Sequence, residues 1–65
     1  MEIFNKVAFM DWITKKNNLD EYTIKLINNL ITYTLINTGT KECFNSTISM
    51  IIPDIITEEL NMFWE

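Results

Sequence analysis

The stretch that decides the fold is NLDEYTIKLINNLITYTLINTG, residues 18–39. Asn18 is a residue type that caps the free amides at a helix start, and Glu21 follows three positions later as the acidic half of a capping box would. Apolar residues then recur three or four positions apart, as one side of a helix requires. Gly39 comes next, and glycine commonly ends a helix in the left-handed conformation. We therefore predict a helix that runs to about Asn37.

Two rows of apolar residues run along this predicted helix. One row is Leu19, Tyr22, Leu26, Leu30 and Tyr33, and the row beside it is Ile27, Ile31 and Leu35. A domain this small has few other large residues with which to fill its interior. We therefore expect four aromatic side chains to lie in the core: Phe4, Tyr22, Tyr33 and Phe44.

A β-hairpin is the alternative for the middle of the chain. Residues 31–35 and 47–51 alternate between apolar and polar types on either side of Gly39, which is typical of paired strands. That pairing would make the fold α+β. The long helical spacing and the strong cap before it favour the helix.

Apolar residues at helical spacing also occur in the segments before residue 18 and after Gly39. Proline is tolerated in the first turn of a helix, so Pro53 indicates a helix start rather than a helix interior. The expected helices run from Glu2 to about Lys16, from about Lys41 to a break near Ile52, and from Pro53 to Phe63. The sequence therefore predicts an all-α fold, with residues 1–65 forming a single small helical domain, a bundle of three to four short helices.

The chain lacks the usual devices that stabilise a very small domain. It has 65 residues, and Cys43 is its one cysteine, so an internal disulfide is not possible. It has no histidine, and one thiolate with scattered carboxylates does not make a zinc site. We expect no metal and no cofactor. Because 48% of the residues are hydrophobic, close packing or association with a partner is the expected source of stability.

The charge and hydropathy of the chain argue against nucleic acid and membrane partners. The net charge is −4, and all five cationic residues are lysines. Nucleic-acid-binding proteins normally carry a basic stripe and use arginine to read bases. No apolar stretch approaches the length of a membrane span, and the N-terminus does not resemble a signal peptide. We expect a cytoplasmic protein that binds neither nucleic acid nor membrane.

Catalytic motifs are also missing. Acid–base chemistry at neutral pH most often uses histidine, and a phosphate-binding loop needs several glycines where this chain has one. Cys43 has only Lys41 nearby as an activating cation, so we interpret it as an apolar residue near a helix start. We expect the protein not to be an enzyme.

Binding to another protein is the remaining class, and the aromatic residues indicate where it would occur. A bundle of this length has little interior, so Phe9, Trp12, Phe63 and Trp64 are more aromatic surface than one copy can bury. A homodimer that shares this surplus is expected, since symmetric dimers are the commonest oligomers. Leu60 and Phe63 continue an apolar row that closes the core, whereas Met62 and Trp64 are expected to point away from it. The predicted protein-binding residues are Phe9, Trp12, Leu60, Met62, Phe63 and Trp64.

One short segment resembles a known docking motif. Bacterial proteins that bind the replication sliding clamp often carry Gln-Leu-(Ser/Asp/Asn)-Leu-Phe, and Glu59-Leu60-Asn61-Met62-Phe63 is similar to it. The segment departs from that motif at Glu59, where glutamine is expected, and at Met62. The resemblance implies a sliding-clamp ligand.

The leading functional hypothesis is a non-enzymatic inhibitor or adaptor that binds a host protein stoichiometrically. The abundance of Ile, Asn and Lys indicates an AT-rich coding sequence, which suits a phage or other mobile element. A structural homo-oligomer subunit is one alternative. An acidic mimic that blocks a nucleic-acid-binding protein is the other.

Overall fold

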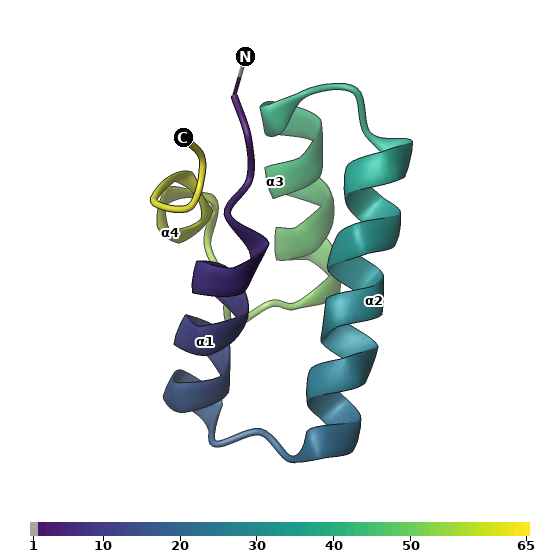
Figure 1. The fold of residues 1–65 in the computed structure, drawn as a ribbon. Coiled ribbons are helices and arrows are strands. Elements are labelled where there is room, and N and C mark those ends of the chain that lie inside the picture. The colour runs from purple at the N-terminus through teal and green to yellow at the C-terminus, as the bar shows by residue number, and fades with distance from the viewer. Residues whose placement is uncertain (1) are drawn as a thin grey trace.

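The computed structural model describes residues 2–65, which form a small all-α bundle (Figure 1). In chain order the helices are α1 (Lys6–Asn17), α2 (Glu21–Asn37), α3 (Lys41–Ile51) and α4 (Thr57–Asn61). Each helix packs against the next one along the chain. The all-α prediction is confirmed. The hairpin alternative is wrong, because residues 31–37 continue α2 and residues 41–51 form α3.

Side-chain caps set the starts of the first three helices. The cap of each helix accepts a hydrogen bond from the amide three residues later: Asn5 from Ala8 at 3.0 Å, Asp20 from Thr23 at 2.8 Å, and Thr40 from Cys43 at 3.1 Å. The predicted cap of α2, Asn18, is wrong by two residues. Asn18 instead ends α1 in the left-handed conformation, with φ of 50°, which asparagine tolerates better than most residues.

The end of α2 differs from the glycine-terminated end that the sequence suggested. Gly39 does not have a positive φ, and Thr38 already leaves the helix in an extended conformation. Two side chains bind carbonyls in the last turn instead. Asn37 Nδ2 donates to the Tyr33 carbonyl at 2.8 Å, and Thr38 Oγ1 donates to the Thr34 carbonyl at 2.8 Å. With these carbonyls satisfied, the helix ends without a left-handed residue.

The two ends of the described chain lie side by side (Figure 1). The amide of Ile3 donates to the carbonyl of Glu65 at 2.9 Å, and the amide of Glu65 donates back to the carbonyl of Ile3 at 2.8 Å. The amide of Asn5 also donates to the carbonyl of Phe63, at 2.6 Å. The prediction that the first helix begins at Glu2 is therefore wrong. The backbone of residues 3–5 bonds to the C-terminal segment, and α1 begins only at Lys6.

The predicted start of the last helix is also wrong. Pro53 lies in a turn that follows α3, and the turn is closed by a 3.0 Å hydrogen bond from the Ile55 amide to the Ile52 carbonyl. This turn buries the side chain of Ile55 completely. The helix begins at Thr57, where Glu59 Oε1 accepts a hydrogen bond from the Ile56 amide at 3.2 Å.

The core draws on every helix and on both terminal segments. Its buried apolar residues are Phe4, Phe9, Ile13, Ile31, Phe44, Ile48, Ile55, Leu60 and Phe63. From α2, therefore, it is the row containing Ile31 that faces inward. Among the described residues, no helix combines the length and apolar character that crossing a bilayer would need.

Candidate protein-binding surface

The structure places most of the predicted protein-binding residues inside the molecule. Phe9, Leu60 and Phe63 are buried, Trp12 and Trp64 are half-buried against the core, and Met62 is exposed. A partner that approaches the folded protein therefore cannot reach Phe9 or Leu60. Met62 is the one residue of the six whose side chain is mostly exposed to solvent.

Aromatic residues near the two chain ends pack against one another and against Phe44 of α3 in what we term the terminal aromatic cluster. Its members are Phe4, Phe9, Trp12, Phe44, Phe63 and Trp64. Ring centroids of neighbouring members are 4.7 to 6.3 Å apart, and several pairs meet edge to face. These are favourable aromatic geometries. Within the cluster Phe9 and Phe63 are buried, whereas Trp12 and Trp64 remain partly exposed, so one copy fully buries two of the four aromatics that were predicted to exceed its interior. The paired terminal segments let the cluster fill the space between α1, α3 and α4.

Trp64 is fixed by polar as well as apolar contacts. Its indole Nε1 donates to Asn45 Oδ1 at 2.9 Å, and Asn45 Nδ2 donates to Asn61 Oδ1 at 2.8 Å. Asn45 is one of two buried polar residues in the described chain, so its hydrogen bonds satisfy an amide that would otherwise be costly to bury. Trp64 thus ties the end of the chain to α3 and does not point away from the core.

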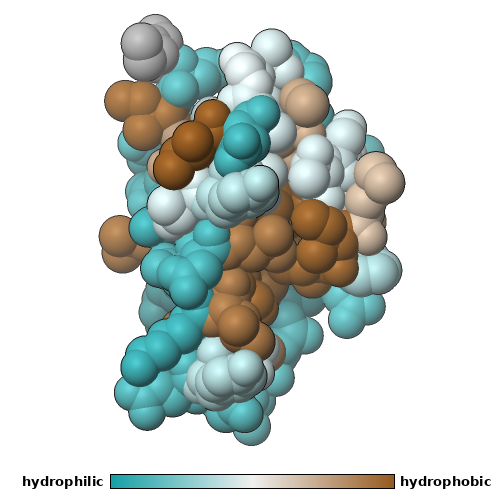
Figure 2. All heavy atoms as spheres, turned by 90° about the vertical axis from the view of Figure 1, so that its right-hand side faces the viewer, coloured by the Kyte–Doolittle hydropathy of each residue, from teal (hydrophilic) through white to brown (hydrophobic). Residues whose placement is uncertain are grey.

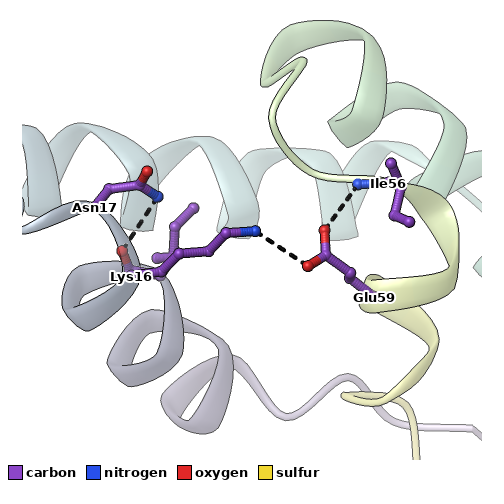
Figure 3. A network of polar contacts seen from close by, with 5 residues as sticks. Lys16, Asn17, Ile56 and Glu59 are labelled. Atoms are coloured by element: carbon purple, nitrogen blue, oxygen red, sulfur yellow. Dashed lines mark hydrogen bonds and ion pairs between the residues drawn. The ribbon is translucent and has the colours of Figure 1, made fainter.

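Lys16 of α1 and Glu59 of α4 form an ion pair (Figure 3). Lys16 Nζ lies 3.1 Å from Glu59 Oε2 and 4.7 Å from the centroid of the Trp12 ring. This arrangement joins α1 to α4 and adds a cation–π contact. The hydrogen bond from the Ile56 amide, together with the Lys16 ammonium, holds the pKa of the Glu59 carboxyl below its usual range.

The same contacts involve the segment that resembles a clamp-binding motif. Glu59 is paired with Lys16, while Leu60 and Phe63 are in the core. Residues 57–61 are helical. The folded protein therefore does not present this segment as a free extended peptide.

Large apolar side chains are exposed on several elements, and α2 carries four of the ten within residues 2–65. The other six are Ile3, Val7, Met50, Ile51, Ile56 and Met62. Tyr22, Leu26, Tyr33 and Ile36 are 71%, 51%, 67% and 76% exposed. The prediction that Tyr22 and Tyr33 belong to the core is therefore wrong. Ile27, Ile31 and Leu35 pack into or against the core from the opposite side of the helix. α2 thus has two apolar sides, of which the bundle covers one.

We term the uncovered side the outer face of α2 and define it by Tyr22, Leu26, Asn29, Tyr33 and Ile36. Successive members are four, three, four and three positions apart, which is the spacing of core positions in a coiled coil. Figure 2 looks onto the side of the molecule on which α2 lies and shows brown, apolar side chains gathered at its centre, with hydrophilic ones in teal beside and below them. Tyrosine is pale on this colour scale, so the brown area marks aliphatic side chains only. The repeat is visible in the sequence. However, α2 also has a second apolar row at helical spacing, Ile27, Ile31 and Leu35, and spacing alone does not show which of the two rows is exposed.

A shallow groove of about 690 Å³ lies elsewhere, between the N-terminal segment, the connection from α2 to α3, and Trp64. Its charged lining residues are Glu2, Lys41 and Glu42, and Lys41 Nζ pairs with Glu2 Oε2 at 3.2 Å. Within residues 2–65, no three His, Cys, Asp or Glu side chains come together in a way that could hold a metal ion.

Comparison with known protein families, with curated proteins and with solved structures gave no match to this chain.

Proposed function

We propose that the protein is a non-enzymatic protein-binding module whose binding surface is the outer face of α2. The single observation that supports this proposal is the exposure of four large apolar side chains along one helix side. Scattered exposed apolar residues are ordinary, but a contiguous apolar patch is characteristic of an interaction site. Two of the four are tyrosines, a residue type enriched at the centres of protein interfaces.

The spacing of the outer face also supports a particular kind of contact. Side chains that repeat every three and four positions present a straight seam, and another helix covers such a seam best. The seam from Tyr22 to Ile36 is about 21 Å long at the rise of an α-helix. The proposed binding mode is therefore helix against helix.

Binding of this kind fits a stoichiometric inhibitor or adaptor, and we include that role in the proposal. The composition suits an origin in a phage or other mobile element. Cys43 is an exposed free thiol, which suits the reducing cytoplasm. The target of such an inhibitor or adaptor would be a host protein.

Affinity purification with matched variants tests the proposal. The α2 variant is Leu26→Glu plus Tyr33→Glu, and the control is Val7→Glu plus Met62→Glu, which adds the same charge at exposed apolar positions away from α2. Circular dichroism first establishes that both variants fold. Tagged protein is then mixed with host lysate and untagged copies of the chain. We expect the wild type and the control to retain the same proteins, and the α2 variant to lose them.

Two results would contradict the proposal. One is retention of every bound protein by the α2 variant, which would locate binding on another surface. The other is loss of the same proteins by the control variant, which would show that added charge alone disrupts binding.

A further inference from the structure

We infer that the partner covering the outer face of α2 is a second copy of this chain, packed antiparallel about a two-fold axis that passes beside Asn29. This inference rests on the proposed function, because it names the partner of the same surface. A face covered by a second copy is not free to bind a host protein, so under this inference the outer face of α2 serves self-association, as in the structural homo-oligomer alternative. The arguments come from the placement of Asn29, from charge, and from area.

Asn29 is the middle member of the five residues on the outer face. In an antiparallel pair, Asn29 faces Asn29 of the second copy, Leu26 faces the partner's Tyr33, and Tyr22 faces the partner's Ile36. Every apolar residue on the face then meets another apolar residue. The two Asn29 side chains complement each other, because an amide carries both donors and an acceptor. A polar residue at a single core position is a known device for fixing the register of paired helices.

Charge favours α2 as the place where two copies meet. The chain has a net charge of −4, so two copies repel each other over most of their surfaces. Within α2 the only charged residues are Glu21 and Lys25, which cancel, and its cap Asp20 adds one negative charge at the start of the helix. The exposed apolar residues near α4 are less suited, since Met62 and Ile56 lie close in sequence to Glu58 and Glu59.

Charge also selects the antiparallel direction. Asp20 and Glu21 form an acidic pair at the start of α2. Parallel packing would bring this pair against its own copy, whereas antiparallel packing separates the two pairs by the length of the helix. Antiparallel helix dipoles also attract one another.

The exposed area is close to what a specific dimer needs. With roughly 200 Å² for each large side chain, the exposed parts of Tyr22, Leu26, Tyr33 and Ile36 come to about 500 Å² per copy. Two copies would then bury about 1,000 Å² from these residues alone, which is about the minimum for a biological interface and below the roughly 1,200 Å² of stable ones. Flanking side chains add to this area.

Sedimentation equilibrium tests the inference with the full chain. We expect the wild type and Val7→Glu to form a dimer with the same dissociation constant. We expect Leu26→Glu to raise that constant at least about tenfold, because it places a carboxylate in the seam. Circular dichroism of each variant, which should match the wild type, shows that any loss of dimer is not a loss of fold.

Mixing two variants tests the direction of packing. In the antiparallel pair, Leu26 of one copy faces Tyr33 of the other. Leu26→Glu and Tyr33→Lys should therefore each dimerise poorly alone, and a mixture of the two should form a heterodimer in which the new carboxylate meets the new ammonium. In a parallel pair these positions do not meet, and mixing would restore nothing.

The outcomes separate this inference from the proposed function. A wild type that stays monomeric at several hundred micromolar would overturn the dimer, and the lysate comparison would still test the α2 face for another partner. Normal dimerisation of Leu26→Glu would overturn the inference by placing the contact elsewhere. Failure of the mixed variants to associate would overturn the antiparallel arrangement.

Discussion

The terminal aromatic cluster and the outer face of α2 are both rich in large apolar side chains, yet one is closed and the other open. In the cluster, Trp64 Nε1 donates to the buried Asn45, and backbone hydrogen bonds join residues 3–5 to residues 63–65. On the outer face, Tyr22 and Tyr33 lie largely in solvent. Aromatic residues thus build the core where backbone hydrogen bonds hold the two chain ends together and Asn45 satisfies the indole of Trp64. The same types of residue remain available for binding where a helix has already buried its other side.

The largest contrast between the two regions should appear when one aromatic is removed from each. Phe9→Ala empties a fully buried position and should cost about 3–5 kcal/mol of unfolding free energy. Tyr33→Ala removes an exposed ring and should change that free energy by no more than about 0.5 kcal/mol in dilute solution. Denaturant unfolding at low protein concentration measures both. Equal losses of unfolding free energy in the two variants would contradict the claim that the cluster is core and the outer face of α2 is not.

A smaller effect should follow from breaking the polar anchor of the cluster. Asn45→Ala leaves the Trp64 indole and the Asn61 side chain without their partner, so it should cost about 1–3 kcal/mol. Trp64→Phe keeps a ring in place and leaves Asn45 bonded to Asn61, and it should cost less. Denaturant midpoints of the two variants check this order. If Asn45→Ala matched the wild type, Trp64 would not need its polar contact.

The Lys16–Glu59 pair should make the closed region sensitive to acid. Because the pKa of Glu59 is lowered in the folded state, its contribution is present above the ordinary carboxyl value of about 4.3 and is lost as pH falls through the folded value. Glu59→Gln should thus be less stable than the wild type at neutral pH, and the two should converge in acid. Thermal melting across pH measures this. Glu58→Gln is the control, since Glu58 makes no hydrogen bond with the described residues; an equal effect there would count against the pair.

The smallest change in unfolding free energy is expected at Ser49, one helical turn beyond Asn45, and there the substitution should stabilise the protein. The hydroxyl oxygen of Ser49 is buried and has no hydrogen-bond partner among the described residues. Ser49→Ala removes this unsatisfied group and improves helix propensity, so it should stabilise the protein by about 0.5–1 kcal/mol. The thermal midpoint would rise. A fall would indicate that the hydroxyl has a partner, such as a bound water.

Helical periodicity was enough to predict the class of fold and the core roles of Leu60 and Phe63. It failed for Tyr22 and Tyr33, because α2 has apolar residues on two sides and spacing alone does not say which side faces inward. The inward side depends on where α1 and α3 pack, which is a property of the whole chain.

The errors near the chain ends share one physical origin. The sequence pattern of residues 2–5 continues that of the first helix, but Asn5 caps the helix and the preceding backbone bonds to residues 63–65. Pairing between segments some 60 positions apart leaves no local signal. A bundle considered without that pairing has little interior for Phe63 and Trp64, which is why the sequence predicts them as part of a binding surface.

The central claim is that the cluster builds the fold while the outer face of α2 binds a second copy. Thermal unfolding of the wild type and Tyr33→Glu over a hundredfold range of protein concentration tests it most directly, since a dimer melts at a temperature that depends on concentration. We predict equal midpoints for the two proteins in dilute solution, with the midpoint rising with concentration for the wild type alone. A midpoint for Tyr33→Glu that is lower even in dilute solution, or that rises in parallel with the wild type, would contradict the account.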